Sequence, residues 1–142
     1  MKRVYAVIDT NILVSALLTK NPESPTVKII NYVFAGTILP VIHRKIIKEY
    51  NRVLRYEKFC FPEDKIKTLV KAIRNNGSRK RPKHCEEKFP DESDRIFYEV
   101  TLSARKRSNT RLVTGNFKHF PAETFIVSAR EMVEIVENTV AG

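Results

Sequence analysis

Residues 4–11 have the sequence VYAVIDTN, in which five largely apolar residues are followed at once by Asp9, Thr10 and Asn11. A nearly continuous apolar run of this length is typical of a strand that is covered on both faces. Asp9 therefore stands where a buried strand gives way to a helix. Ligands of open α/β sheets bind at this carboxyl end of the strands, so Asp9 is the first candidate site residue.

The rest of the chain alternates short β-rich runs with amphipathic segments, which is the pattern of an α/β fold. We expect helices at 11–18, 25–35, 43–55, 62–76, 91–107 and 129–138, and further strands at 38–42, 111–114 and 124–127. Strands that are separated by helices predict a mainly parallel sheet. Residues 78–90 show little periodicity, so we expect a surface loop there, the least core-like stretch of the chain.

The length and charge fit one soluble globular domain over residues 1–142 that has a polyanionic partner. A domain of this size typically buries roughly 70% of its extended surface. The chain has 26 Lys and Arg against 16 Asp and Glu, a formal charge of +10. Because Lys and Arg release counterions when they neutralise phosphates, nucleic acid is the partner that this charge favours. Solubility alone would also account for it.

The sequence predicts a cytoplasmic protein with no membrane partner. It holds no run long and apolar enough to span a bilayer, and Asp9 interrupts the N-terminal apolar run before a signal-peptide core could form. Cys60 and Cys85 have no CxxC partner, and a chain of this size does not need a disulfide. We expect both thiols to be reduced.

Glu49 lies at the border of the buried stripe in the helix expected at 43–55. At about 100° per residue, it falls beside Ile42 and Val53, whereas the basic residues of this helix gather on another face. A carboxylate without a partner is unusual at such a border. The ordinary explanation is an ion pair with Lys45, four residues earlier. The other explanation is that Glu49 belongs to an acidic site.

The segment Asp91-Glu92-Ser93-Asp94 places three acids at the start of the next expected helix. Asp91 suits the capping position, and an acid in the first turn favours the helix dipole. Capping explains one acid well and leaves Asp94 as a candidate ligand. Together, Asp9, Glu49 and Asp94 predict a metal site that is assembled by folding.

Three such carboxylates would need a cation. At about 4 Å and an effective dielectric of about 20, each pair would repel by roughly 4 kcal/mol. Mg²⁺ is a hard ion that prefers oxygen ligands and is commonly shared between one or two carboxylates and a substrate phosphate; Mn²⁺ is the alternative. Such an ion polarises a phosphoryl oxygen and lowers the pKa of bound water, so the pattern predicts phosphodiester hydrolysis.

Other catalytic and metal-binding patterns are missing from the sequence. His43, His84 and His119 do not have the spacing of a ligand set, and His84-Cys85 has no second Cys/His pair with which to bind zinc. The serine-hydrolase frame GxSxG and the P-loop are both missing. Asn11 argues against phosphatases that carry two acids in a DxD motif after the first strand, because an amide cannot act as their general acid.

Four segments, in this order, resemble the successive motifs of the PIN domain family. They are Asp9-Thr10-Asn11, Ile46-Ile47-Lys48-Glu49-Tyr50, Asp91-Glu92-Ser93-Asp94-Arg95-Ile96-Phe97 and Val113-Thr114-Gly115-Asn116. The likeness spans almost the whole chain and is close to the bacterial and archaeal single-domain PIN proteins that act as toxins in toxin–antitoxin modules. It implies a metal-dependent ribonuclease with a three-layer α/β/α fold around a parallel sheet of four to five strands. It also implies a homodimer and a small antitoxin protein as partner.

Carried over position by position, the resemblance assigns the metal to Asp9, Glu49, Asp94 and, at the fourth position, Asn116. Many family members have an acid at the fourth position, and His119 stands where a further aspartate is frequent. An amide can bind a metal or its water through the carbonyl oxygen but supplies no charge. This difference argues against a second metal more than against the first.

Further residues would support the chemistry. Thr10, Asn11 and Thr114 would orient carboxylates, waters or phosphate, although capping and turn formation are their ordinary roles. Asp91 would have a secondary role beside the site. The RNA backbone would be gripped by basic residues of the expected loop, namely Arg79, Lys80, Arg81 and Lys83. The alternative function is a PIN-like module that binds RNA or protein and whose chemistry Asn116 has weakened.

Overall fold

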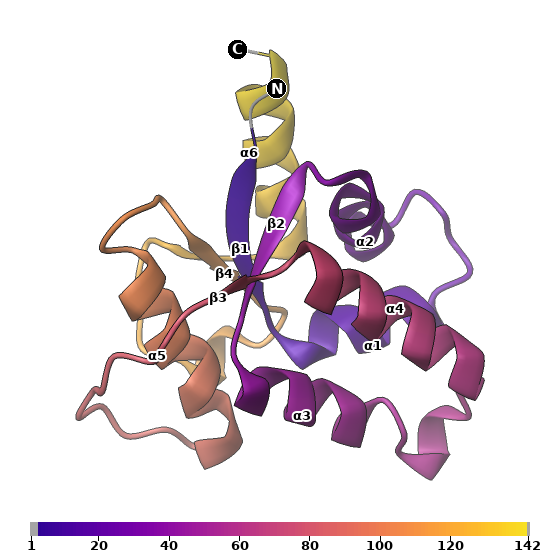
Figure 1. Cartoon of the computed structure of the whole chain (residues 1–142), viewed down its shortest axis with the longest axis horizontal. Coiled ribbons are helices and arrows are strands. Elements are labelled where there is room, and N and C mark those ends of the chain that lie inside the picture. The colour runs from indigo at the N-terminus through magenta and orange to yellow at the C-terminus, as the bar shows by residue number, and fades with distance from the viewer. Residues whose placement is uncertain (1–2, 142) are drawn as a thin grey trace.

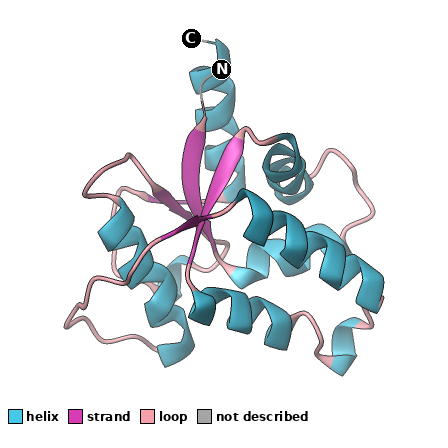
Figure 2. Cartoon of the chain, viewed as in Figure 1, coloured by secondary structure: helices cyan, strands magenta, loops and turns pink. Residues whose placement is uncertain are grey.

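The computed structural model describes residues 3–141, which form five strands and six α-helices (Figures 1 and 2). The strands are β1 (Val4–Ile8), β2 (Ile38–Ile42), β3 (Ser78–Arg79), β4 (Arg111–Val113) and β5 (Ile126–Val127). The helices are α1 (Thr10–Leu18), α2 (Pro25–Ala35), α3 (Arg44–Val53), α4 (Glu63–Asn76), α5 (Arg95–Ala104) and α6 (Ala129–Ala141). Short 3-10 turns occupy Glu57–Phe59, Glu92–Asp94 and Phe117–His119.

The strands form one sheet in the order β3-β2-β1-β4-β5, and every neighbouring pair is parallel. The expected α/β fold with a parallel sheet is confirmed. The chain builds β2 and β3 on one side of β1, and then β4 and β5 on the other. The direction of winding therefore changes between β1 and β4, and the crevice outside their carboxyl ends is the usual ligand site of such sheets.

Helices cover both faces of the sheet. Helix α5 packs on β1, β2 and β4, while α2 and α4 pack on β2 and α6 packs on β4 and α2. Figure 1 shows α5 on one side of the strands and α2 and α4 on the other. Helix α3 contacts α1, α4 and α5, so it joins the two helical layers near the end of the sheet where β2 finishes.

The core follows the apolar pattern of the sequence. Val7 and Ile8 of β1 are 0% exposed, which confirms a strand that is covered on both faces. Gly36 ends α2 with φ +80°, a left-handed conformation that favours glycine. Among residues 3–141, no helix is long and apolar enough to cross a membrane. Both cysteines are free thiols, with Cys60 exposed and Cys85 buried.

The expectation of a surface loop over 78–90 is wrong in two respects. Its first two residues form β3 beside β2, and Cys85 and Phe89 are buried in the core. Helix α5 holds this segment down, because the Arg95 guanidinium donates to the carbonyl oxygens of Cys85 and Glu87 at 3.0 and 2.8 Å. The backbone N–H of Cys85 also donates to a carboxylate of α5, that of Glu99, at 3.0 Å. These partners lie eight to fourteen residues away, so local periodicity cannot show them.

The helix expected at 91–107 is shorter in the structure. A 3-10 turn over Glu92–Asp94 precedes α5, which ends at Ala104. Asp91 caps this turn, as expected, by accepting from the Ser93 N–H at 3.0 Å. The turn leaves Asp94 at the N-terminal boundary of α5, where its side chain does not cap the helix.

Candidate active site

Strand register places Asp9 beside Thr114. Ile8 of β1 pairs with Val113 of β4, so the residues that follow them are neighbours at the switch point. The Thr114 hydroxyl donates to Asp9 Oδ2 at 2.7 Å and accepts from the Asn116 N–H at 3.0 Å. The Asn11 side chain accepts from the Gly115 N–H at 3.3 Å. The loop after β4 is thereby fixed to the loop after β1.

Asp9 is a buried carboxylate, with a residue exposure of 5%. It precedes α1 but makes no side-chain capping bond to it, so capping does not explain its presence. Burial raises the pKa of Asp9 from 3.8 to about 6, against the opposing hydrogen bond from Thr114, and the nearby charge of Asp94 raises it further. Ionised Asp9 is therefore held in a state that a nearby cation would stabilise.

Helix α3 is anchored to the same edge by Tyr50. This side chain is 0% exposed, and its hydroxyl donates to the carbonyl oxygen of Ile8 at 2.5 Å. Glu49 precedes Tyr50 and lies at the border of the buried stripe, as expected, with 18% of its side chain exposed. Its partner is Arg52 rather than Lys45. The guanidinium donates to both carboxylate oxygens, each at 2.9 Å.

Asp94 reaches this edge from the 3-10 turn before α5. His119, from the turn after β4, lies with Nδ1 2.9 Å from Asp94 Oδ2. Burial raises the pKa of Asp94, and the contact with His119 opposes that shift. Asp91 lies nearby and has its pKa lowered, chiefly by the hydroxyl and N–H of Ser93.

These elements enclose a cavity of about 240 Å³, which we call the acidic cavity. Asp9, Glu49, Asp94 and Asn116 all line it. Its other polar lining residues are Thr10, Asn11, Arg52, Tyr56, Asp91, Ser93 and His119. The structure thus brings together every metal-site residue that the sequence suggested. Thr114 does not line the cavity, but it contacts the site through its hydrogen bond to Asp9. Arg52 was missed as a member, because only its side-chain contacts reveal that it faces the cavity.

A family model described as PIN domain matches residues 5–118. The chain belongs to the PIN domain family. The matched segment runs from β1 past Asn116 and includes Asp9, Glu49 and Asp94. PIN domains are generally nucleases and typically use divalent metals. No curated protein and no solved structure gives a significant match to the chain.

The donor set of this PIN domain suits a hard divalent cation. Asp9 and Asp94 offer carboxylates, Asn116 offers an amide oxygen, and Thr10 Oγ1 is buried with no hydrogen-bond partner in the described part of the chain. All of these donors are oxygens, which Mg²⁺ and Mn²⁺ prefer. The buried charge of Asp9 has no Lys or Arg partner among the salt bridges of residues 3–141.

The ligands do not, however, stand ready around a common point. Within residues 3–141, no three His, Cys, Asp or Glu side chains are close enough together to hold a metal ion. Glu49 is instead paired with Arg52, and Asp94 is in hydrogen-bond contact with His119. For Glu49 to bind a metal ion, its carboxylate would have to leave the Arg52 guanidinium.

The predicted RNA-binding residues divide into two groups. Arg79, Lys80 and Arg81 line a second, positively charged hollow together with Arg44. Lys83 does not line this hollow. Its backbone N–H donates to the Glu99 carbonyl of α5 at 2.9 Å.

Proposed function

We propose that this PIN domain is a metal-dependent endoribonuclease that hydrolyses RNA phosphodiester bonds. One observation carries the proposal. Asp9, Glu49 and Asp94 come from three separate elements and line one cavity at the switch point of the sheet. The net charge of +10 supports a polyanionic substrate, and the family is one of nucleases.

Each acid has a distinct part in this proposal. Asp9 is the central ligand, because Thr114 fixes one of its oxygens and burial leaves its charge in need of a cation. Asp94 and Glu49 would complete the carboxylate set from α5 and α3. A bound Mg²⁺ or Mn²⁺ would neutralise phosphoryl charge and supply a water of lowered pKa. Asn116 offers an uncharged oxygen at the fourth position, which supports a single firmly held ion.

The side chains around the acids would orient the substrate. The Asn11 amide donates to Thr114 Oγ1 at 3.5 Å, and its oxygen is held by Gly115, so this amide stabilises the loop against which a phosphate would rest. His119 is half-exposed beside Asp94, with 37% of its side chain accessible. It lines the acidic cavity, where it would contact a substrate phosphate.

Cleavage of a mixed RNA by the purified protein in Mg²⁺, in Mn²⁺ and in EDTA tests this proposal. We expect cutting in either metal, none in EDTA, and none from the Asp9→Asn/Asp94→Asn double variant prepared in the same way. The double variant guards against a contaminating nuclease. Cutting that persists in EDTA or in the double variant would contradict a metal site at these acids.

A second candidate function is a PIN-like module that binds RNA or protein without cutting. It is favoured by one observation, namely that Glu49 already has Arg52 as its partner and Asp94 already has His119 within hydrogen-bond distance. Under this hypothesis RNA binding is unchanged by Asp9→Asn, and neither form cleaves RNA at high protein concentration in either metal. The cleavage assay therefore separates the two functions.

We further propose that the protein acts in the cytoplasm as the toxin of a type II toxin–antitoxin module, as a homodimer restrained by a small antitoxin. The support is the resemblance of its motifs to the single-domain PIN toxins. Induced expression should arrest growth, and Asp9→Asn should relieve the arrest at equal protein level. Arrest by both forms would contradict a toxin that acts through RNA cleavage. Sedimentation of the purified chain would measure its oligomeric state.

A further inference from the structure

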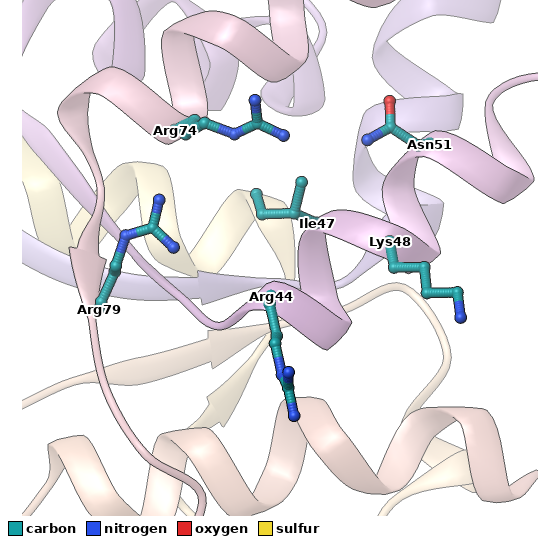
Figure 3. A pocket seen from close by; sticks show the side chains of 6 residues that line it. All are labelled: Arg44, Ile47, Lys48, Asn51, Arg74 and Arg79. Carbon is teal, nitrogen blue, oxygen red and sulfur yellow. The ribbon is translucent and has the colours of Figure 1, made fainter.

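Another cavity, of about 460 Å³, opens between α3, α4 and β3 next to the hollow lined by Lys80 and Arg81 (Figure 3). Four of its lining residues are cationic, namely Arg44, Lys48, Arg74 and Arg79, and we call this site the basic pocket. Its remaining lining residues are Ile47 and Asn51, so no acid lines it in the described part of the chain. Figure 3 shows Arg74 and Arg79 reaching toward Ile47 from α4 and β3.

The fold assembles these charges from three elements. Arg44 and Lys48 lie one turn apart on α3. Arg79 of β3 pairs with Ile42, the last residue of β2 before α3, so the register sets Arg79 beside the start of that helix. Arg74 lies in the last turn of α4, and Gly77 lets the chain that follows pass close to Ile42 of β2. A Cβ at Gly77 would lie 2.6 Å from the Ile42 side chain.

The basic pocket has no internal counter-charge. None of its four cations takes part in a salt bridge within residues 3–141, and all four residues are exposed. Arg44 also occupies the first residue of α3, where a positive charge opposes the helix dipole. Folding stability therefore gives no reason for this arrangement, whereas an anionic ligand would.

A third hollow lies between the basic pocket and the acidic cavity along α3 and shares lining residues with each. Lys48 lines both the basic pocket and this hollow of about 410 Å³. Glu49, Arg52 and Ser93 line both that hollow and the acidic cavity. At about 1.5 Å per residue, the eight residues from Arg44 to Arg52 cover about 12 Å. The hollow also has acids in its lining, namely Glu49, Glu92 and Glu99, of which the first two are paired with Arg52 and Arg95. A chain of phosphates would therefore follow its α3 side, past Lys45, Lys48 and Arg52.

We infer that the basic pocket binds backbone phosphates of the RNA strand whose scissile phosphate lies in the acidic cavity. This inference rests on the proposed ribonuclease function, which supplies the identity of the strand. The substrate is then an extended single strand that crosses the outer side of α3. A dinucleoside monophosphate has only one phosphodiester, so it cannot occupy both sites.

Binding of a fluorescently labelled, unstructured single-stranded RNA, measured by anisotropy in EDTA, tests the inference without any cleavage. We compare the wild type with Arg74→Ala/Arg79→Ala and with a control of equal charge change, Arg107→Ala/Arg130→Ala. All four arginines are exposed. The pocket variant should bind at least about tenfold more weakly, and the slope of log affinity against log salt should fall by about 1.4, or 0.7 per lost phosphate contact. The control should change affinity less than about twofold.

Cleavage in Mn²⁺ as a function of RNA length supplies the second readout. At subsaturating RNA, the pocket variant should lose at least about tenfold more of its cleavage rate on a twelve-nucleotide strand than on a dinucleoside monophosphate, because only the longer strand reaches the basic pocket. Equal binding by the pocket and control variants would overturn the inference while leaving the nuclease intact. Pocket-dependent RNA binding by a protein that never cleaves would overturn the proposed function and keep RNA as the ligand. Competition by an acidic peptide but not by RNA would show that the pocket binds protein instead.

Discussion

Lys48 and Glu49 are consecutive residues of α3, yet they belong to two sites of opposite character. In the acidic cavity, the three candidate carboxylate ligands are partly or fully buried and already have partners. Asp9 has Thr114, Glu49 has Arg52, and Asp94 has His119. In the basic pocket, the charged side chains are exposed and have no acidic partner within residues 3–141.

The two sites therefore differ in what they contribute: the acidic cavity positions reacting groups, and the basic pocket attracts the RNA. Groups held by neighbours keep a fixed geometry, so their loss should appear in the rate of the chemical step. Exposed and unpaired cations offer long-range charge with little fixed geometry, so their loss should appear in affinity and in its dependence on salt. Helix α3 contributes to both sites, because its adjacent residues Lys48 and Glu49 face different neighbours.

Of these variants, Asp94→Asn should have the largest effect on cleavage by the acidic cavity. We expect the single-turnover cleavage rate at saturating RNA to fall at least about 100-fold, because a charged metal ligand is lost. RNA affinity in EDTA should stay within about twofold. Arg74→Ala/Arg79→Ala is the matched comparison, and it should show the reverse pattern. If Asp94→Asn weakened RNA binding as strongly as it slowed cleavage, the two sites would not be separable.

Thr114→Val should slow cleavage about 10- to 100-fold, the usual effect of removing a group that orients a metal ligand. The change keeps the size of the side chain and removes the 2.7 Å bond to Asp9. Mn²⁺ affinity, measured without RNA, should fall together with the rate. Thr101→Val is the control, because Thr101 is also buried but donates to the Phe97 carbonyl within α5. Equal losses in both variants would mean a general effect on stability.

The sequence predicted those parts of the fold that depend on local pattern. The apolar run of β1, the proline and glycine that bound α2, and the position of Glu49 beside Tyr50 follow from periodicity and capping, and the structure agrees. Asp9 could be located because the end of a parallel strand is set by the sequence alone. A common site for Asp9, Glu49 and Asp94 could be suggested because each acid stands at the edge of an apolar segment, and the resemblance of four motifs in order added Asn116.

Features that depend on distant partners could not be predicted. Arg52 belonged to the basic face in the sequence, but it turns to bind Glu49. Strand β3 is only two residues long, and its pairing with β2 gives no local signal. Phe89 is buried in a stretch that looks like a loop, because Arg95 stacks over its ring at 4.7 Å. The basic pocket joins three elements, so no single segment of sequence describes it.

Asp9→Asn should stabilise the metal-free protein at alkaline pH. Because burial raises the pKa of Asp9 from 3.8 to about 6, the folded state binds the extra proton between these values. The resulting stability is complete below pH 3.8 and is lost as the pH rises through 6. Ionised Asp9 then costs up to about 3 kcal/mol, which asparagine avoids.

Thermal unfolding in EDTA measures this difference. The variant should unfold at a higher temperature than the wild type at pH 8, and the two should converge near pH 4. Added Mg²⁺ should stabilise the wild type and leave Asp9→Asn unchanged. Glu137→Gln on the exposed side of α6 controls for the change in net charge. A variant that is less stable than the wild type at pH 8 would contradict an unpaired buried charge at Asp9.

Arg52→Ala should change Mn²⁺ affinity by the smallest amount of these predictions. It tests directly whether the paired state of Glu49 distinguishes the acidic cavity from the basic pocket. The Glu49–Arg52 pair occupies a carboxylate that a metal would use, and the arginine side chain is 50% exposed. Because an exposed ion pair contributes about 0.2–1 kcal/mol, freeing Glu49 should tighten Mn²⁺ binding in the absence of RNA by about 1.4- to 5-fold.

Arg55→Ala is the matched control for this variant, since Arg55 forms an equivalent pair with Glu63, which does not line the cavity. Calorimetric titration with Mn²⁺ should show tighter binding for Arg52→Ala alone. Weaker binding would mean that Arg52 supports Glu49 as a ligand, and the acidic cavity would then be preformed. Tighter binding would mean that Glu49 has to leave the Arg52 guanidinium in order to bind Mn²⁺. Metal binding would then break the ion pair that holds Glu49 in the metal-free protein.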